Sequence, residues 1–169
     1  MINREDKVNM SFGYFDCELG KIKIEVQDKY VVAIEFVSDE NLEIEEINSE
    51  EESNVINKCR IQLDEYFKGN RKKFDLDIKF IKGTIFQRNV WNELLRINYG
   101  ETVSYKEIAE KLGKPNACRA VGGANNKNPI AIIVPCHRVI GKNGKMVGYA
   151  DGIEKKEFLL NLEKNKLLY

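Results

Sequence analysis

The first half of the chain alternates polar and apolar residues in short runs that are typical of β-strands. Residues 21–26 (KIKIEV) predict a strand that is buried on one face. Residues 30–37 (YVVAIEFV) are rich in β-branched residues and predict a second strand, with a turn at residues 27–29. Residues 74–80 (FDLDIKF) alternate again, which indicates a candidate further strand.

A helical spacing of apolar residues follows these strands. It runs over residues 55–67, and Gly69-Asn70 is expected to end the helix. The first half therefore predicts a small α/β unit with a short antiparallel sheet. No residue in it stands out as a candidate for catalysis.

The second half is dominated by helix signals. Thr84 with Gln87 fits a capping box and predicts a helix that continues to Ile97. Ser104 with Glu107 is a second capping box, at the start of a short helix. Each box satisfies two backbone amides that a helix N-terminus would otherwise leave unpaired.

The short helix ends at Gly113-Lys114-Pro115, and a third helix is expected over residues 117–126. Two short helices joined by a tight turn indicate a helix-turn-helix. The predicted fold class is therefore α+β. A supporting α/β domain (1–80) precedes a mostly helical domain (81–169) with a winged-helix-like helix-turn-helix, which is a candidate for DNA binding.

Two adjacent glycines, Gly122 and Gly123, lie in the middle of the third helix. Each costs about 1 kcal/mol relative to alanine in a helix interior. Either a neighbouring helix packs tightly against them, or the helix enters a narrow groove of DNA with Arg119 projecting from it. The charge of the second half favours the DNA interpretation.

Composition adds limits to this outline. The chain has 169 residues with 43% hydrophobic and 32% charged residues, which is typical of a folded globular protein. A polar N-terminus and the lack of a long apolar run argue against secretion and membrane insertion, so the expected compartment is the cytoplasm.

The net charge of zero hides a strong asymmetry. Residues 1–80 carry 12 Lys and Arg against 19 Asp and Glu, a net of −7, while residues 81–169 carry 15 against 8, a net of +7. The acidic run at residues 39–52 is interpreted as a solvated loop or helix face. The basic half is able to attract phosphate.

The four cysteines, Cys17, Cys59, Cys118 and Cys136, are scattered and form no C-x-x-C pair. We therefore expect free thiols. With one histidine in the chain, no metal site is expected. Three of the cysteines are interpreted as packing residues, and Cys136 as a reactive one.

Cys136 stands directly before His137, the only histidine, at the end of an apolar run. Residues 130–134 (IAIIV) predict a buried strand or extended segment that Pro135 ends. Neighbouring side chains on a strand point to opposite faces, so either Pro135 turns the chain or a water relays the proton. The nucleophile would be a thiolate kept partly ionised by this base and an adjacent helix N-terminus.

These residues resemble a known family, the O6-alkylguanine-DNA alkyltransferases. Residues 130–139 (IAIIVPCHRV) are similar to the active-site segment of that family. Four further blocks match it in order, at residues 83–91, 102–109, 119–129 and 148–163. The resemblance covers about residues 83–163, whereas residues 1–80 match only in size and rough layout.

The resemblance implies roles for individual residues. Cys136 would accept the alkyl group, His137 would take its proton through a water, and Glu163 would orient His137. Tyr105 would rotate the 3′ phosphate and protonate the leaving guanine, and Asn128 would hold the turn before the active-site segment. Without the family, Glu163 is as readily a surface carboxylate paired with Lys166.

The resemblance also implies surfaces for DNA and for the base. The residues expected to contact DNA are Arg119, which would replace the flipped nucleotide in the base stack, Tyr105, Ala120, Gly122, Gly123 and Asn125. The residues expected to line the base pocket are Val139, Tyr149, Ala150 and Asp151. The family usually has Gly-Gly where this chain has Asp151-Gly152, which puts the range of accepted lesions in question.

The implied function is single-turnover DNA repair. The protein would flip O6-alkylguanine from duplex DNA, mainly O6-methylguanine, with O4-methylthymine as a further candidate, and transfer the alkyl group irreversibly to Cys136. No cofactor is needed because the lesion is the alkyl donor. The expected partner is double-stranded DNA with alkylated bases, bound by a monomer. The alternatives are a non-enzymatic sensor of alkylated DNA and a helix-turn-helix regulator that senses redox state.

Overall fold

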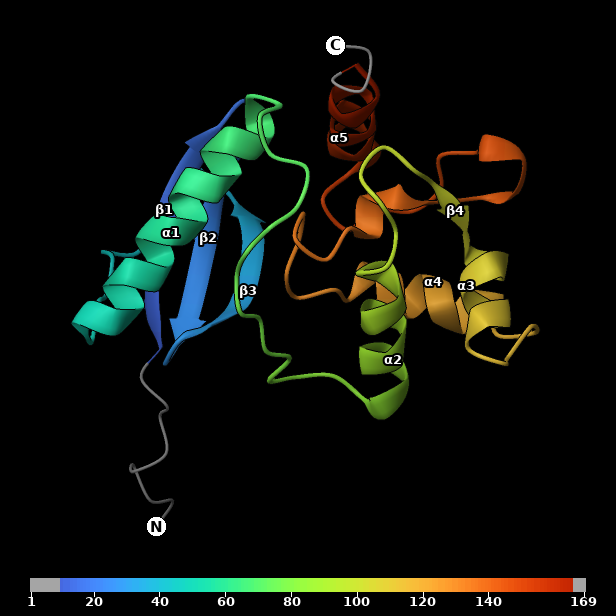
Figure 1. The fold of residues 1–169 in the computed structure, drawn as a ribbon, viewed down its shortest axis with the longest axis horizontal. Helices are drawn as coiled ribbons and strands as arrows, with labels where there is room; N and C mark the ends of the chain where they lie inside the picture. The colour runs from blue at the N-terminus through green and yellow to red at the C-terminus, as the bar shows by residue number, and fades with distance from the viewer. Residues whose placement is uncertain (1–9, 166–169) are drawn as a thin grey trace.

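A three-stranded antiparallel sheet forms the N-terminal unit in the computed structural model, which describes residues 10–165 (Figure 1). Its strands follow the order β1 (Ser11–Cys17), β2 (Gly20–Gln27) and β3 (Tyr30–Val37). The two predicted strands correspond to β2 and β3, and Asp28 turns between them with φ of 55°. β1 was not predicted, because its sequence SFGYFDC does not alternate strictly.

Helix α1 (Glu50–Phe67) lies across one face of this sheet (Figure 1). It begins five residues before the predicted start, where the Ser49 side chain accepts a hydrogen bond from the backbone of Glu52. The buried face of α1 contributes Ile56, Leu63 and Tyr66 to the core. Apart from the short helix η1 (Asp39–Asn41), most of the acidic run before α1 is exposed, as expected for a solvated segment.

The strand predicted over residues 74–80 is wrong. Only Ile78 pairs, in a single parallel bridge with Val31 of β3. Further along the same edge, Ile34 of β3 pairs with Ile130 instead. Since residues 129–131 occupy that edge, residues 74–80 pack their apolar side chains on the core without forming a ladder.

The C-terminal unit is mostly helical (Figure 1). Its elements are α2 (Ile85–Leu94), β4 (Val103–Ser104), α3 (Tyr105–Lys111), α4 (Cys118–Asn126), η2 (Cys136–Arg138), β5 (Val139–Ile140), η3 (Lys142–Gly144) and α5 (Ile153–Asn165). Both capping boxes are confirmed, at Thr84 and at Ser104. Helix α2 ends before the predicted Ile97, because the amides of Arg96 and Ile97 bond three residues back and tighten the last turn.

The apolar run at residues 130–134 is buried as predicted but is not a strand. Ile130 makes one bridge to β3, and the chain then turns sharply, so that the amide of Val134 bonds the carbonyl of Ile130 at 3.0 Å. Ile132 adopts a left-handed φ of 69°, which is unusual for a β-branched residue. This turn leads through Pro135 into Cys136.

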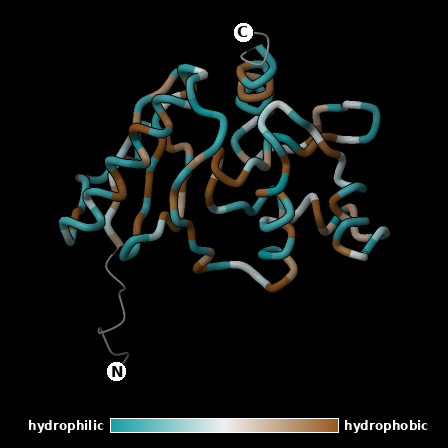
Figure 2. The backbone as a smooth tube through the Cα atoms, in the orientation of Figure 1, coloured by the Kyte–Doolittle hydropathy of each residue, from teal (hydrophilic) through white to brown (hydrophobic). Residues whose placement is uncertain are grey.

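Hydrophobic and hydrophilic segments alternate along the elements of both units (Figure 2). None of the helices within residues 10–165 combines the length and apolar character needed to cross a membrane. The core is instead continuous between the sheet, α1 and the C-terminal helices.

Candidate active site

Cys136 is the first residue of the 3-10 turn η2, directly after Pro135. The sequence left two alternatives, a sharp turn at Pro135 or a relaying water, and the structure has the turn. Cys136 and His137 therefore do not have the strand geometry that would point their side chains to opposite faces. Cys136 is 5% exposed and His137 is fully buried. The thiol and the imidazole therefore share one protected environment.

Glu163 of α5 accepts hydrogen bonds from four residues and is itself fully buried. Its Oε1 lies 2.7 Å from His137 Nε2, 2.7 Å from the Tyr66 hydroxyl and 3.0 Å from Arg138 Nη2. Its Oε2 lies 2.9 Å from Arg138 Nε and 3.0 Å from the backbone nitrogen of Gly100. Glu163 is thus no surface carboxylate.

This environment keeps Glu163 ionised. Burial alone would raise its pKa, but hydrogen bonds and charge from His137 and Arg138 outweigh burial and lower the pKa to about 2. Arg138 is held in turn by the carbonyl of Ile97, at 2.7 Å from Nη1. The carboxylate is a fixed negative charge behind the imidazole.

The partner of His137 determines its tautomer. Nε2 faces an ionised carboxylate oxygen, so it carries the hydrogen, and Nδ1 keeps a lone pair. Nδ1 is buried and has no protein partner within residues 10–165. Burial lowers the pKa of His137 despite the opposing effect of Glu163, so the ring is neutral at neutral pH. A neutral imidazole with a free Nδ1 is able to accept a proton.

The Cys136 thiol is neutral at rest. Burial raises its pKa, and the side chains of Asn128 and Tyr149 and the charge of Lys156 oppose this shift only in part. This differs from the partly ionised thiol that the sequence suggested, because the short turn η2 leaves the sulfur almost fully enclosed. The nucleophile has to be generated by proton transfer.

Two asparagines hold the acceptor turn in place. Asn128 Nδ2 donates to the carbonyl of Val134 at 2.8 Å, and its Oδ1 accepts from the amide of Ile130 at 3.1 Å. Asn125, expected to contact DNA, is buried and donates to the carbonyl of Cys136 at 3.3 Å. Asn125 belongs to the last turn of α4, whose inner face packs on η2, and this explains the difference.

The outer face of α4 agrees better with a DNA contact. Arg119, Ala120 and Gly123 are exposed. A Cβ atom placed on Gly123 would meet nothing within 4 Å, and one on Gly122 would meet only the Tyr105 ring, at 3.8 Å. Packing within the protein therefore does not require these glycines.

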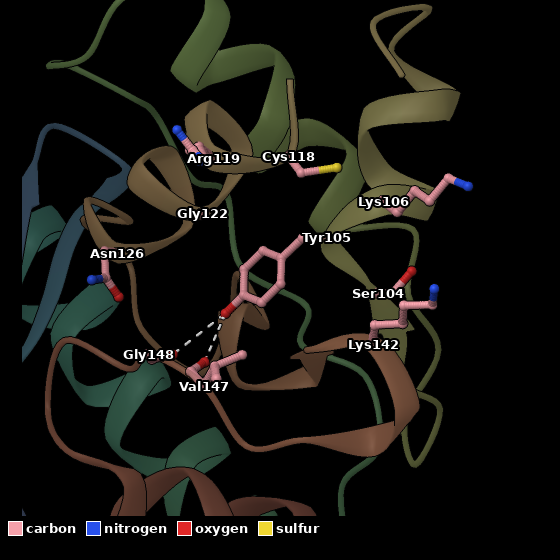
Figure 3. A pocket seen from close by; sticks show the side chains of 10 residues that line it. All are labelled: Ser104, Tyr105, Lys106, Cys118, Arg119, Gly122, Asn126, Lys142, Val147 and Gly148. Carbon is pink, nitrogen blue, oxygen red and sulfur yellow. Dashed lines mark hydrogen bonds between the residues drawn. The ribbon is translucent and has the colours of Figure 1, made fainter. Parts of the chain in front are cut away.

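A cavity of about 560 Å³ opens beside α4 (Figure 3). Its lining residues are Ser104, Tyr105, Lys106, Cys118, Arg119, Gly122, Asn126, Lys142, Val147 and Gly148. Three basic side chains and the Tyr105 ring at its centre make it suitable for phosphate and a planar base.

The segment that follows β5 closes one side of this cavity (Figure 3). The Tyr105 hydroxyl donates to the carbonyl of Val147 at 2.9 Å and lies 3.4 Å from that of Gly148. The buried Lys156 ammonium of α5 donates to the carbonyls of Val139 at 2.5 Å, Val147 at 3.2 Å and Gly148 at 3.3 Å.

The four residues predicted to line the base pocket do not all line one cavity. Val139 and Tyr149 are buried, Ala150 is exposed and Asp151 is half-buried, and burial raises the pKa of Asp151. Ala150 and Asp151 line a second cavity of about 450 Å³ that also includes Asn128. Cys136 lines neither cavity.

Three residues of the site were missed by the sequence analysis: Tyr66, Arg138 and Lys156. Arg138 carries a usable signal, since it is a charged residue directly after His137 and before the apolar pair Val139-Ile140. Lys156 carries a weaker one, because it lies among the charged residues Glu154, Lys155 and Glu157 on the last helix. Tyr66 carries none, because it is one of several aromatic residues in a half of the chain without candidate chemistry.

Comparisons with known proteins agree with this arrangement. Residues 10–80 match the family domain described as "6-O-methylguanine DNA methyltransferase, ribonuclease-like domain". Residues 85–165 match "6-O-methylguanine DNA methyltransferase, DNA binding domain". The two matches together cover most of the chain.

Two similar proteins are named methylated-DNA–protein-cysteine methyltransferase. The one from Methanosarcina acetivorans is 49% identical over 150 residues, which are 89% of this chain and 83% of that protein. The one from Methanosarcina barkeri is 60% identical over 106 residues, which are 63% of this chain and 66% of that protein, just under two thirds of its length.

Solved structures show the same fold. Mycobacterium tuberculosis O6-methylguanine methyltransferase is 38% identical, with a TM-score of 0.80 and 94% of both chains covered. The structure of Mycobacterium tuberculosis OGT in complex with DNA is 39% identical, with a TM-score of 0.81, and covers 92% of this chain and 93% of that one.

Proposed function

The chain belongs to the 6-O-methylguanine DNA methyltransferase family, and from this premise we propose that it repairs DNA by transferring an alkyl group to its own Cys136. The substrate is O6-alkylguanine in duplex DNA, mainly O6-methylguanine, with O4-methylthymine as a second candidate. The observation that carries the proposal is the buried arrangement of Cys136, His137 and Glu163, in which a neutral thiol lies beside an oriented base.

The first step is proton transfer from Cys136. The Sγ proton passes, through a water, to Nδ1 of His137, whose Nε2 hydrogen is held by Glu163. The resulting imidazolium is balanced by a carboxylate that stays ionised. Burial makes the thiolate costly, so it forms only as the substrate arrives.

The second step is substitution at the alkyl carbon. The thiolate sulfur attacks this carbon, the carbon–oxygen bond breaks, and guanine leaves with a proton supplied by the Tyr105 hydroxyl. The proton that His137 took from Cys136 is released to solvent, and Tyr105 regains one from solvent, so both side chains end neutral. A thioether forms on Cys136 and is not reversed by thiol exchange, so each molecule acts once. The lesion supplies the alkyl group, and the reaction needs no cofactor.

Access to the lesion requires the base to leave the duplex. We propose that α4 approaches the minor groove through Gly122 and Gly123 and that Arg119 fills the space of the extruded nucleotide. Tyr105 releases Val147 when the base enters, because its hydroxyl is engaged there in the free protein. The structure of the related M. tuberculosis protein in complex with DNA supports DNA binding by this chain.

The division of labour between the two units is part of the proposal. We place the boundary after residue 80, in the irregular segment between α1 and α2, in keeping with the ends of the two family matches. The N-terminal unit supports the segment that leads to Cys136 through the bridge between Ile34 of β3 and Ile130.

The test is the mass of the peptide that contains Cys136. The protein is incubated with duplex DNA carrying O6-methylguanine and then digested. The peptide should gain one methyl group in the wild type and in Cys118→Ala, whose thiol lines the neighbouring cavity, but not in Cys136→Ala. An unmodified peptide together with tight lesion binding would instead support a sensor without transfer activity.

A further inference from the structure

One residue of the N-terminal unit reaches the reactive network of the C-terminal unit. Tyr66 lies on α1 and is fully buried. Its hydroxyl lies 2.7 Å from Oε1 of Glu163, a residue 97 positions later in the chain. Nothing in the reaction proposed above uses this contact.

We propose that Tyr66 is a positioning residue for alkyl transfer, because its hydroxyl holds the Glu163 oxygen that orients His137. This inference rests on the proposed function. It assigns the N-terminal unit a direct part in the chemistry, in addition to support of the fold.

Three hydrogen-bond donors converge on one oxygen of Glu163. Oε1 of Glu163 accepts from His137 Nε2, Arg138 Nη2 and the Tyr66 hydroxyl, whereas Oε2 accepts from Arg138 Nε and the Gly100 amide. The Tyr66 hydroxyl and the His137 imidazole therefore bond the same atom, Oε1 of Glu163. A hydrogen bond to an ionised carboxylate withdraws charge from it and weakens its other bonds.

Removal of the Tyr66 hydroxyl should change the pKa of the His137 imidazole. Oε1 would become more basic and would hold the Nε2 hydrogen of His137 more tightly. The imidazole would then accept a proton at Nδ1 more readily, so its pKa should rise. Tyr66 thus keeps His137 neutral at the pH of reaction while Glu163 keeps it oriented.

Other groups near His137 are accounted for. Lys156 of α5 and Arg138 of η2 carry positive charge and lower the His137 pKa, and Glu163 raises it. Tyr99, from the loop before β4, packs its ring 6.1 Å from that of Tyr66.

Tyr99 offers a matched control. Its ring also lies under the Arg138 guanidinium, at 5.7 Å. Its hydroxyl, however, is buried with no hydrogen-bond partner within residues 10–165. Tyr99→Phe removes the same atom as Tyr66→Phe from the same aromatic cluster, without removing a hydrogen bond to Glu163.

The experiment is an NMR titration of His137 in the free protein. It is the only histidine in the chain, so in a protein without a histidine tag its ring signals need no assignment. Tyr66→Phe should raise the titration midpoint by about 0.5 pH unit or more. Tyr99→Phe should leave it at the wild-type value. Equal midpoints in the wild type and both variants would overturn the inference.

A second measurement links the contact to activity. The pH dependence of Cys136 alkylation by free O6-alkylguanine base should show its acidic limb displaced upward in Tyr66→Phe by the same amount, and unchanged in Tyr99→Phe. If the wild type transfers no alkyl group, the proposed function fails, while the NMR titration still decides the Tyr66 contact.

If Tyr66→Phe does not fold, a second variant with the opposite expected effect on the His137 midpoint tests the proposal. Incorporation of 3-fluorotyrosine at position 66 keeps the hydroxyl and makes it a stronger donor. The His137 midpoint should then fall below the wild-type value. A rise or no change would count against the proposal.

Discussion

The side-chain nitrogen of Asn128 lies 2.8 Å from the carbonyl oxygen of Val134, and this bond closes the turn that leads to the acceptor cysteine. The same side chain accepts a hydrogen bond from the amide of Ile130 and donates a longer one, of 3.4 Å, to the carbonyl of Ile130, so one residue satisfies three backbone groups of a buried loop. Buried backbone groups without partners are costly, and the turn depends on Asn128 for that reason.

Asn128→Ala should therefore lower the free energy of unfolding by about 2 to 3 kcal/mol, because it removes three hydrogen bonds to a buried loop, one of them long. It should also slow alkylation of Cys136 by the free base, because the sulfur is no longer held in place. Urea denaturation and the single-turnover rate check both effects. Asn126→Ala, at an exposed neighbouring position, should leave stability unchanged; an equal loss in both variants would argue against the turn as the cause.

Glu163→Gln should slow the reaction of Cys136 with free O6-alkylguanine by about tenfold or more, since general-base assistance is commonly worth that much. The amide keeps the shape of the side chain but removes the charge that balances protonated His137. The rate is measured with the free base at neutral pH, so DNA binding does not enter. A rate equal to that of the wild type would return Glu163 to a purely structural role.

The acid stability of the protein should also depend on Glu163. Its pKa is lowered to about 2 in the folded protein, from an ordinary value of 4.5. The ionised carboxylate thus stabilises the fold fully above about pH 4.5, and this contribution of about 3 kcal/mol is lost as the pH falls through 2.

The free energy of unfolding, measured by urea titration from pH 5 to pH 2, should consequently fall more steeply in the wild type than in Glu163→Gln. Glu163 also raises the pKa of His137, so the His137 titration is measured in each protein by NMR and its contribution is subtracted before the slopes are compared. Parallel curves would show that Glu163 does not carry the shifted pKa.

Gly123→Ala should separate stability from DNA binding. An added Cβ meets open space in the protein, so the variant should gain up to about 1 kcal/mol from helix propensity. Duplex affinity should fall if this face of α4 approaches DNA closely. Thermal unfolding and a duplex-binding titration measure the two effects, and a more stable variant with unchanged affinity would mean that DNA does not reach Gly123.

Arg119→Ala should slow repair of O6-methylguanine in duplex DNA and spare the reaction with the free base. The exposed guanidinium is needed only when a nucleotide is displaced from a stack. Arg88→Ala, another exposed arginine outside the cavity, is the control and should change neither rate. Equal losses on both substrates would contradict a role of Arg119 in flipping.

Local signals in the sequence were reliable. The capping boxes at Thr84 and Ser104 involve residues three apart, and both form as predicted. The strands at β2 and β3 and the buried position of the acceptor segment also follow from local pattern. The family resemblance named Glu163, which the structure places at 2.7 Å from His137.

Features that depend on distant partners could not be predicted. Residues 74–80 alternate like a strand, but the edge of β3 that they would need is taken by Ile130. Asn125 lies on the recognition helix but faces inward, because η2 packs beneath it. The contact between Tyr66 and Glu163 joins the two units through residues that are 97 positions apart, and no spacing in the sequence predicts it.

The joint between β3 and the acceptor segment is made by main-chain atoms. The amide of Ile34 bonds the carbonyl of Pro129 at 2.9 Å, and the amide of Ala131 bonds the carbonyl of Ile34 at 3.0 Å. Main-chain groups are the same in every amino acid except proline, so these two hydrogen bonds do not depend on which side chains stand at positions 34 and 131. Other substitutions at these positions are expected to act through packing in the shared core, while the joint itself persists.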